Sequence, residues 1–407
     1  MAPERTVRVS IPVGKYPPQF TGQGIQIKRS LPYLVARGVD PTILAYRLPA
    51  AFGPPPADGP GKVDRVLTAG AGRLSTLLRI LQFRKYFRGH GAGFDVLHCD
   101  LLGWEFLMNI RYLKALGLPI IMEMLLLGGD DPLTLSQERF GAFKRRLLDH
   151  VDVWLGLSGA FFPRVLAAGI PGEKFRLVYP GVDLDAYRPL TPEERRATRA
   201  RLGLPGDARI VMSVGSVIRR KGVDRLLRAW ERLRPRHGRD LLVIVGPATA
   251  AEGLEGDDLT FAEAARESSR APTLDGTVLW VGRRDNINDY LGAANLFLFL
   301  SRQEGLGIVI LEALACGLPC ILSPLDGIAS EIVSDGGTGM IIKDPDDDAA
   351  VAEAVAHLLD RPDARRAMGE ASRKTAVQRF TFDARADALA AIYRDLATRA
   401  RRPYATL

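Results

Sequence analysis

The chain has 407 residues, 47% of them hydrophobic and 25% charged, which is enough for two globular domains that each have their own core. No apolar run approaches the roughly 18 residues that cross a bilayer, no signal-peptide core is present near the first residue, and three cysteines (Cys99, Cys316 and Cys320) do not suggest a disulfide framework or a metal site, so we expect a cytoplasmic protein. The formal net charge of +8 suits phosphate ligands or an anionic membrane surface better than nucleic acid, for which no binding motif occurs.

The first half of the chain alternates strand-like and helix-like segments. We predict strands at residues 7–13, 41–46, 96–99 and 119–122, and helices at residues 25–37, 74–88 and 104–116. Such alternation is typical of an α/β domain in which a parallel sheet has helices on both faces. We therefore expect an N-terminal Rossmann-like domain over residues 1–186.

A strong helix start opens the second half. Thr191 and Glu194 have the spacing of a capping box, and Pro192 occupies the first helical position, so we predict a helix over residues 190–202. Further strands are expected at residues 210–214, 241–245, 278–281, 296–300 and 320–323, and helices at residues 223–233, 286–294 and 382–402. The polar region 247–272 is predicted to be a loop or an insertion. The second Rossmann-like domain is expected over residues 187–380.

The segment 301–323, SRQEGLGIVILEALACGLPCILS, is the most informative part of the chain. Glu304 and Glu312 stand eight positions apart, around a glycine-containing turn that leads from a strand into a helix. Such a turn leaves backbone N–H groups free, and the helix dipole favours an anion there. At about 1.5 Å per helical residue the glutamates lie up to about 12 Å apart, too far to share a proton or a metal ion. They are placed to bind two parts of one elongated ligand with its phosphates between them.

Residues 304–320, EGLGIVILEALACGLPC, resemble the donor-binding signature of the retaining family-4 glycosyltransferases, also called glycosyl transferases group 1. The resemblance is strong from about residue 177 to 393 and weak before residue 150. It implies the GT-B fold: two Rossmann-like parallel-sheet domains facing across a cleft, with a C-terminal helix, 381–407, that crosses back to the N-terminal domain. It also implies retaining transfer of a hexosyl group from a nucleoside-diphosphate sugar to a hydroxyl acceptor.

The resemblance assigns donor-binding roles within this segment. Glu304 would face the donor sugar and take part in catalysis, and Glu312 would accept hydrogen bonds from the ribose hydroxyls. The backbone beside the sugar and diphosphate would come from Gly305, Leu306, Gly307 and Ile308.

A second donor-binding element is residues 214–222, VGSVIRRKG. Lys221 matches the lysine that binds the donor diphosphate in the family, and we expect it to act in catalysis. Ser216 stands where the family has an arginine, and Arg219 or Arg220 could supply the missing charge from the same loop. The base pocket would be lined by Gly282 and Arg283, mainly through backbone groups.

The loop 16–24, YPPQFTGQG, follows the first strand. The family usually has a Gly-Gly pair here that lets the backbone approach the donor phosphates. Gly22 matches the second glycine, Thr21 replaces the first, and Gly24 could restore some flexibility. A plain surface turn is the alternative.

Acceptor-side residues are expected in the first half. The segment 119–132, PIIMEMLLLGGDDP, lacks the histidine that many relatives have after this strand, and Glu123 falls near its position. Asp130 and Asp131 could contact sugar hydroxyls or a cationic acceptor, or could belong to a polar loop. His98 matches a histidine often found at the end of an earlier strand, where it can equally be structural.

A membrane-binding surface is a further expectation. Residues 77–88, LLRILQFRKYFR, combine leucine and phenylalanine with arginine and lysine, and such a helix could rest on anionic lipid at the inner face of the membrane. The alternative is a core-facing helix with its arginines on the solvent side.

No metal and no cofactor beyond the nucleotide sugar are expected, because GT-B relatives generally need none. The expected partners are the nucleotide sugar and a glycan, lipid-linked or small-molecule acceptor, without nucleic acid. Ser216 and the missing histidine leave two alternatives: a non-catalytic nucleotide-sugar-binding partner subunit, and a GT-B sugar-nucleotide epimerase.

Overall fold

The computed structural model describes residues 5–19, 21–48, 59–70, 72–100, 103–234 and 238–400. These residues form two compact units. Unit 1 contains the described residues up to Gly181 and those from Phe382 onward, and unit 2 is Val182–Thr381. The division lies five residues before the predicted domain boundary at residue 186, and the chain returns to unit 1 for its last helix.

The described part of unit 1 contains a seven-stranded parallel sheet in the order β3-β2-β1-β4-β5-β6-β7. Its strands are β1 (Val7–Pro12), β2 (Val39–Tyr46), β3 (Lys62–Leu67), β4 (Val96–Cys99), β5 (Ile120–Met124), β6 (Val153–Gly156) and β7 (Phe175–Leu177). Its helices are α1 (Gly22–Val35), α2 (Arg73–His90), α3 (Trp104–Leu107), α4 (Ile110–Ala115), α5 (Pro132–Gln137), α6 (Gly141–Leu148), α7 (Phe161–Ala167) and α16 (Phe382–Ala400). The predicted helix 104–116 is two helices, because Asn109 lies between them and donates to Glu105 O and to Ile80 O.

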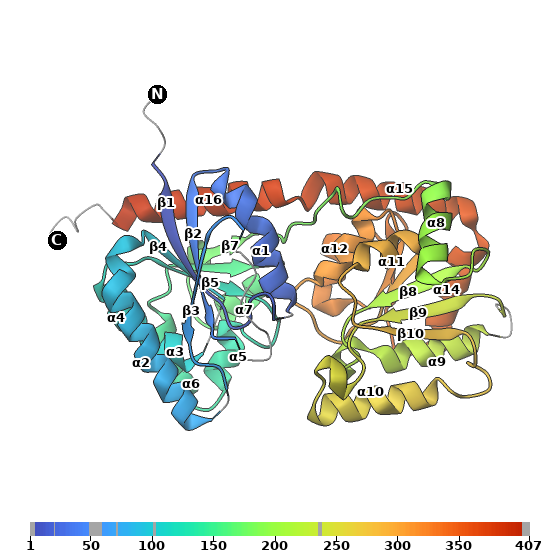
Figure 1. Cartoon of the computed structure of the whole chain (residues 1–407), viewed down its shortest axis with the longest axis horizontal. Helices are drawn as coiled ribbons and strands as arrows, with labels where there is room; N and C mark the ends of the chain where they lie inside the picture. Colours follow the sequence, from blue (N-terminus) through green and yellow to red (C-terminus); the bar gives the residue numbers. More distant parts are fainter. Residues whose placement is uncertain are drawn as a thin grey trace. The chain divides into compact units, whose positions relative to one another are not determined.

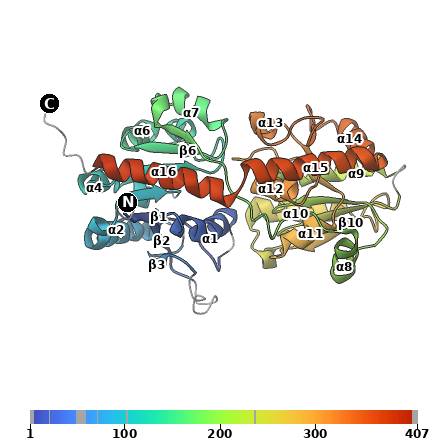
Figure 2. The ribbon, with the colours of Figure 1, turned by 90° about the horizontal axis from the view of Figure 1, so that it is seen from above.

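The last helix, α16, is part of the unit 1 core. Leu389, Ala390 and Tyr393 pack in one cluster with the apolar residues of β1 and β2. Figures 1 and 2 both show α16 running beside α1, and Arg37 after α1 joins the two helices through ion pairs with Asp383 and Asp387 at 2.8 and 2.5 Å. The sheet of unit 1 therefore receives one of its covering helices from the end of the chain.

The described part of unit 2 contains a six-stranded parallel sheet in the order β10-β9-β8-β11-β12-β13. Its strands are β8 (Ile210–Val214), β9 (Leu241–Val245), β10 (Val278–Gly282), β11 (Leu296–Phe299), β12 (Cys320–Leu322) and β13 (Gly339–Ile341). Its helices are α8 (Pro192–Leu202), α9 (Val223–Leu233), α10 (Gly256–Ser268), α11 (Ile287–Ala293), α12 (Ile308–Ala315), α13 (Ile328–Ile332), α14 (Asp348–Asp360) and α15 (Pro362–Arg379).

The two faces of the unit 2 sheet are covered by different helices. Apolar residues of α9, α10 and α14 form one core cluster with β8, β9 and β11. On the other side, α11 packs against α8 and α12 packs against α15. The region 247–272, which the sequence predicts to be a loop or an insertion, contains the regular helix α10. The loop alternative is wrong because α10 is a polar surface helix that buries only Ala262 and Ala265 and so shows little apolar periodicity.

Candidate functional site

Glycines end neighbouring strands at the carboxyl edge of the unit 2 sheet. Gly215 and Gly246 follow β8 and β9 with φ of 151° and 148°, and Gly282 ends β10 with φ of 75°. A Cβ on Gly246 would lie only 2.1 Å from Gly215 O. These glycines let the loops approach each other closely at the edge where α/β sheets bind ligands.

A charged cluster forms beside these loops, where β11 ends. Lys221 Nζ donates to Glu304 Oε1 at 2.6 Å, Arg220 Nη1 lies 3.2 Å from the same oxygen, and Ser301 Oγ donates to it at 2.7 Å. The structure thus brings together three residues that the sequence predicts for donor binding: Glu304, Lys221 and Arg220. Lys221 and Arg220 stand 83 and 84 positions before Glu304 in the sequence.

Lys221 is held in a confined environment. Its Nζ lies 5.1 Å from the ring centroid of Phe299, in addition to its contact with Glu304. Burial lowers the pKa of Lys221, the charge of Glu304 opposes that shift, and the nearby Arg220 adds to it. One carboxylate, that of Glu304, therefore pairs with two cations. The cluster keeps an excess of positive charge and can bind a further anion with little reorganisation.

The loops that carry this cluster are fixed to each other. Arg302 forms a bidentate pair with Asp224 at 2.8 and 2.7 Å and also donates to Arg219 O at 2.7 Å. Gly222 has φ of 68°, and a Cβ there would lie 2.1 Å from Leu300 O. The backbone next to Lys221 therefore passes directly against the end of β11, which positions the lysine over Glu304.

The helix α12 begins next to the cluster. Its N-cap is Gly307 with φ of 85°, and no side chain caps it. Gly305 and Leu306 are buried in the turn, and Ile308 opens the helix. Glu312 is partly exposed one to two turns further along α12. An uncapped helix start beside two cations is suited to a phosphate group.

A carboxylate from the segment after β9 contacts the turn after β10, and the sequence analysis missed it. Glu252 accepts hydrogen bonds from Arg283 N at 2.7 Å and Ala248 N at 2.8 Å, and a Cβ on Gly282 would lie 2.3 Å from its Oε1. Burial would raise the pKa of Glu252, but these backbone donors outweigh burial and lower it. Glu252 lies in the region predicted to be a loop, so its sequence offered no sign of this role. Ser216 lies in the neighbouring turn after β8, and its carbonyl accepts from Ile218 N.

In unit 1, the predicted glycine loop leads into α1. Thr21 is the N-cap and accepts from Gly24 N at 2.9 Å, and Gly22 is the first helical residue. A Cβ on Gly22 would meet nothing within 4 Å, whereas one on Gly24 would lie 2.6 Å from Lys15 O. The close backbone approach in this loop is therefore at Gly24, and Gly22 is exposed at the helix start.

His98 and Glu123 lie together in a buried network. His98 Nε2 is 3.1 Å from Glu123 Oε2, and His98 Nδ1 is 2.6 Å from Tyr393 Oη. Arg385 donates to Glu123 Oε1 at 2.6 Å. Burial would raise the pKa of Glu123, but the charge of Arg385 and the hydrogen bond to His98 outweigh it and lower the pKa to about 2. Both residues thus have structural partners on α16.

Asp130 and Asp131 organise the loop after β5. Asp130 accepts from Leu125 N and Leu126 N at 2.9 to 3.0 Å, and burial raises its pKa to about 6. Asp131 is fully buried, caps α5 by accepting from Thr134 N, and pairs with Arg164 at 2.8 Å. The polar-loop alternative accounts for these contacts.

Asp100 is a carboxylate that the sequence analysis passed over. It follows β4 directly, and its Oδ1 is buried without a hydrogen-bond partner among the described residues. Burial, with the negative charge of Glu123, raises its pKa to about 8. Its position at the carboxyl end of a central strand was the signal available in the sequence. Within the described ranges no three His, Cys, Asp or Glu side chains are grouped so as to hold a metal ion.

Known proteins resemble the chain along both units. The family model "Glycosyl transferases group 1" matches residues 194–375, and "Glycosyl transferase 4-like domain" matches residues 21–181. Alpha-D-kanosaminyltransferase of Streptomyces kanamyceticus is 29% identical over 86% of this chain and 89% of its own length. The GDP-mannose-dependent alpha-(1-6)-phosphatidylinositol monomannoside mannosyltransferase of Mycolicibacterium smegmatis is 33% identical over 60% of this chain.

The chain spans 63% of that mannosyltransferase and about half of some other relatives that it matches. Among solved structures, sucrose-phosphate synthase from Thermosynechococcus elongatus has a TM-score of 0.81 at 21% identity, over 97% of this chain and all of that one. The likeness extends through both parallel sheets. The chain therefore belongs to the glycosyl transferases group 1, the family-4 glycosyltransferases, and has the two Rossmann-like units of the GT-B fold.

Proposed function

We propose that this protein transfers a hexosyl group from a nucleoside-diphosphate sugar to a hydroxyl acceptor, with retention at the anomeric carbon. The observation that carries the proposal is the Lys221–Glu304–Arg220 cluster beside the uncapped start of α12. Two cations and a helix N-terminus at the carboxyl edge of a parallel sheet suit a diphosphate.

The same cluster suits the chemistry of a departing nucleoside diphosphate. Cleavage of the donor leaves negative charge on the phosphates, and Lys221, Arg220 and the N–H groups at Gly307 would stabilise it in a preorganised site. Arg220 reaches Glu304 from the loop in which Ser216 replaces the family arginine, so it is the cation we assign to the second phosphate contact.

Glu304 is oriented for a sugar. Its partners among the described residues, Lys221, Ser301 and Arg220, all contact Oε1 and leave Oε2 without a donor from them. A carboxylate held by one oxygen presents the other in a defined direction, where it can accept hydrogen bonds from two sugar hydroxyls. Glu312 on α12 would then bind the ribose, and the turn at Gly282 and Arg283 would bind the base through backbone groups.

The first test measures nucleoside-diphosphate release from a panel of UDP-, GDP- and ADP-sugars. GDP-mannose is included because the mannosyltransferase relative is named for it. We expect release from one donor, at least 100-fold slower in Glu304→Ala and Lys221→Ala, and unchanged in Arg270→Ala, whose exposed side chain pairs with Glu267 elsewhere in unit 2.

The products separate this proposal from its alternatives. A transferase turns over faster with an acceptor present and yields one anomer of the glycoside. A partner subunit would bind the donor without releasing nucleotide, and an epimerase would alter the sugar with no acceptor. Binding of no nucleotide sugar at all would refute the proposal.

We also propose that the acceptor is membrane-associated and that α2 contacts an anionic lipid surface. Four leucines of α2 are exposed at helical spacing, Leu74, Leu77, Leu78 and Leu81, with exposed fractions of 40 to 72%. Exposed Arg84, Lys85 and Arg88 continue the same stripe. The core-facing alternative accounts for Phe83, Tyr86 and Phe87, which are the buried residues of α2, whereas the four leucines are exposed. None of the helices in the described ranges is long and apolar enough to cross a bilayer.

Vesicle flotation tests the α2 surface. We expect the protein to float with vesicles that contain anionic phospholipid and not with neutral ones, and we expect Leu77→Gln with Leu81→Gln to abolish flotation. The matched control is Leu166→Gln, because Leu166 is an exposed leucine on another helix of unit 1, α7. Equal flotation of the double variant and the control would refute the assignment.

A further inference from the structure

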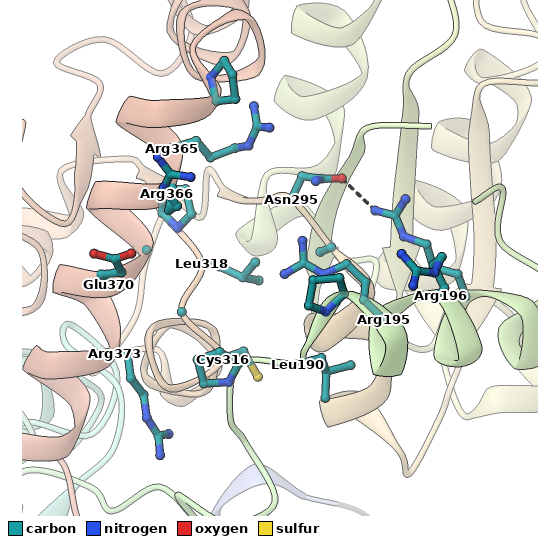
Figure 3. Close-up of a pocket in the computed structure, with 18 of the residues that line it drawn as sticks. Leu190, Arg195, Arg196, Asn295, Cys316, Leu318, Arg365, Arg366, Glu370 and Arg373 are labelled. Carbon is teal, nitrogen blue, oxygen red and sulfur yellow. Dashed lines mark hydrogen bonds between the residues drawn. The ribbon is translucent and has the colours of Figure 1, made fainter. Parts of the chain in front are cut away.

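Unit 2 has a cavity of about 620 Å³ at the edge of its sheet opposite the donor cluster. The cavity lies between α8, α15 and the segments that precede β11 and β12 (Figure 3). Six residues of extended chain lead from Asn295 in its wall to Ser301 at the donor cluster. At about 3.3 Å per residue this distance is about 20 Å, so the cavity is separate from the donor cluster.

The wall of the cavity is strongly cationic. It contains six arginines and a single acidic residue, Glu370. Figure 3 shows Arg195 on one wall and Arg365 and Arg366 on the other, with Leu318 between them. The arginines are Arg195, Arg196, Arg199, Arg365, Arg366 and Arg373.

Four of the six arginines have partners of their own. Arg196 pairs with Glu193 and Arg366 with Asp363, each at 2.9 Å or less. The other two donate to backbone carbonyls: Arg199 to those of Ala293, Gly206 and Ala208, and Arg373 to those of Tyr187 and Ala315. These four side chains are held in the wall by their own partners. The two arginines that remain are Arg195 and Arg365.

Arg195 is the exception on its helix. Its Nε is buried and finds no hydrogen-bond acceptor in the part of the chain that the structure describes. Burial lowers its pKa. Arg365, across the cavity, donates by Nη1 to two carbonyls at the end of α14, and burial with the positive charges of Arg209 and Arg195 lowers its pKa. The positive charge of Arg195 thus acts against that of Arg365 across a cavity whose lining contains one carboxylate, Glu370.

An anion in the cavity would remove this repulsion. A buried polar group without a partner destabilises the folded state, and more so when it is charged. Guanidinium presents N–H donors in a planar fork that matches phosphate oxygens. The volume lies within the range of small-molecule sites, and it exceeds what a single inorganic ion needs.

We propose that this cavity binds a phosphorylated small molecule, a phosphate ester or polyphosphate, with Arg195 and Arg365 as its principal ligands. This would be a second ligand site in unit 2, distinct from donor binding.

Calorimetric titration with pyrophosphate tests the proposal. The titration uses Lys221→Ala protein, so that the donor cluster contributes less to binding. In this protein, a second substitution, Arg195→Met, is expected to weaken pyrophosphate binding at least 10-fold. We expect Arg365→Met to weaken it as much. Added Arg270→Met is the control and leaves the affinity unchanged, because Arg270 is an exposed arginine paired with Glu267.

A second readout checks that the effect is local. Without ligand, the Arg195→Met protein is expected to melt at the same temperature as its parent or higher, because it loses a half-buried guanidinium whose buried Nε has no acceptor among the described residues. Pyrophosphate should raise the melting temperature of the parent and leave that of Arg195→Met unchanged. Equal affinity in parent and Arg195→Met, or an equal rise with sodium chloride of the same ionic strength, would overturn the proposal.

Discussion

Replacing Gly222 by alanine probes how closely the donor loop approaches the end of β11. Two costs add at this position. Alanine at φ of 68° costs about 1 to 2 kcal/mol because its Cβ disfavours the left-handed region. The new Cβ would also lie 2.1 Å from Leu300 O, a backbone atom that cannot rotate away, and such overpacking typically costs a further 1 to 3 kcal/mol.

The same unit offers a closely matched control. Gly203 also has φ of 68° and follows a helix, but a Cβ there would meet nothing within 4 Å. We expect Gly203→Ala to lose about 1 to 2 kcal/mol of unfolding free energy and Gly222→Ala about 2 to 5 kcal/mol, measured by denaturant unfolding followed by tryptophan fluorescence.

Donor binding should separate the two variants further. Gly222→Ala displaces the backbone next to Lys221, so its nucleoside-diphosphate affinity should fall at least 10-fold, while that of Gly203→Ala stays at the wild-type value. Equal losses of stability in both variants would show that the contact with Leu300 O carries no strain, and the argument for a positioned Lys221 would fail.

Three further outcomes are expected. Arg385→Met leaves Glu123 buried without its cation and should cost about 3 to 5 kcal/mol of unfolding free energy, whereas exposed Arg399→Met should cost less than 0.5 kcal/mol. Asp100 has a folded pKa of about 8, above its ordinary value, so the folded state keeps a proton that the unfolded chain releases above about pH 4. Stability should therefore fall between pH 4 and 8 by up to about 1.4 kcal/mol per pH unit, and melting curves of Asp100→Asn should lack this component; parallel curves would contradict the assignment. Finally, we expect sugar transfer to persist at full rate in excess chelator, and a loss that added Mg²⁺ or Mn²⁺ restores would overturn the expectation of metal-free catalysis.

Local signals in the sequence predict a large part of the fold. The capping box at the start of α8 is confirmed, since Thr191 accepts from Glu194 N and the Glu194 side chain accepts from Thr191 N. The strand before Glu304 and the helix after it are also confirmed. These elements are encoded by neighbouring residues, so a single segment is enough to identify them. Helix α10 shows where prediction from local signals fails, because its few small buried residues form no apolar stripe in the sequence.

The parts of the site that the sequence did not reveal depend on distant residues. The family pattern marks Lys221 and Glu304 as donor-binding residues, but it predicts neither their contact with each other nor those of Glu252 with Arg283 N and of Glu123 with Arg385. From the sequence alone, a carboxylate in a polar stretch is predicted to be exposed to solvent. Its hydrogen bond to a distant backbone N–H group becomes visible only in the folded structure. Asp100 was missed for a related reason: an unpartnered oxygen is a property of the folded environment and not of the residue type.

The position of α16 in unit 1 has a consequence for how the protein is made. His98 and Glu123 obtain Tyr393 and Arg385 as partners only from a helix that begins at Phe382. A ribosome therefore finishes all of unit 2 before it supplies the residues that neutralise Glu123. Until then the seven strands of unit 1 are all synthesised, but their sheet lacks one covering helix and Glu123 lacks Arg385.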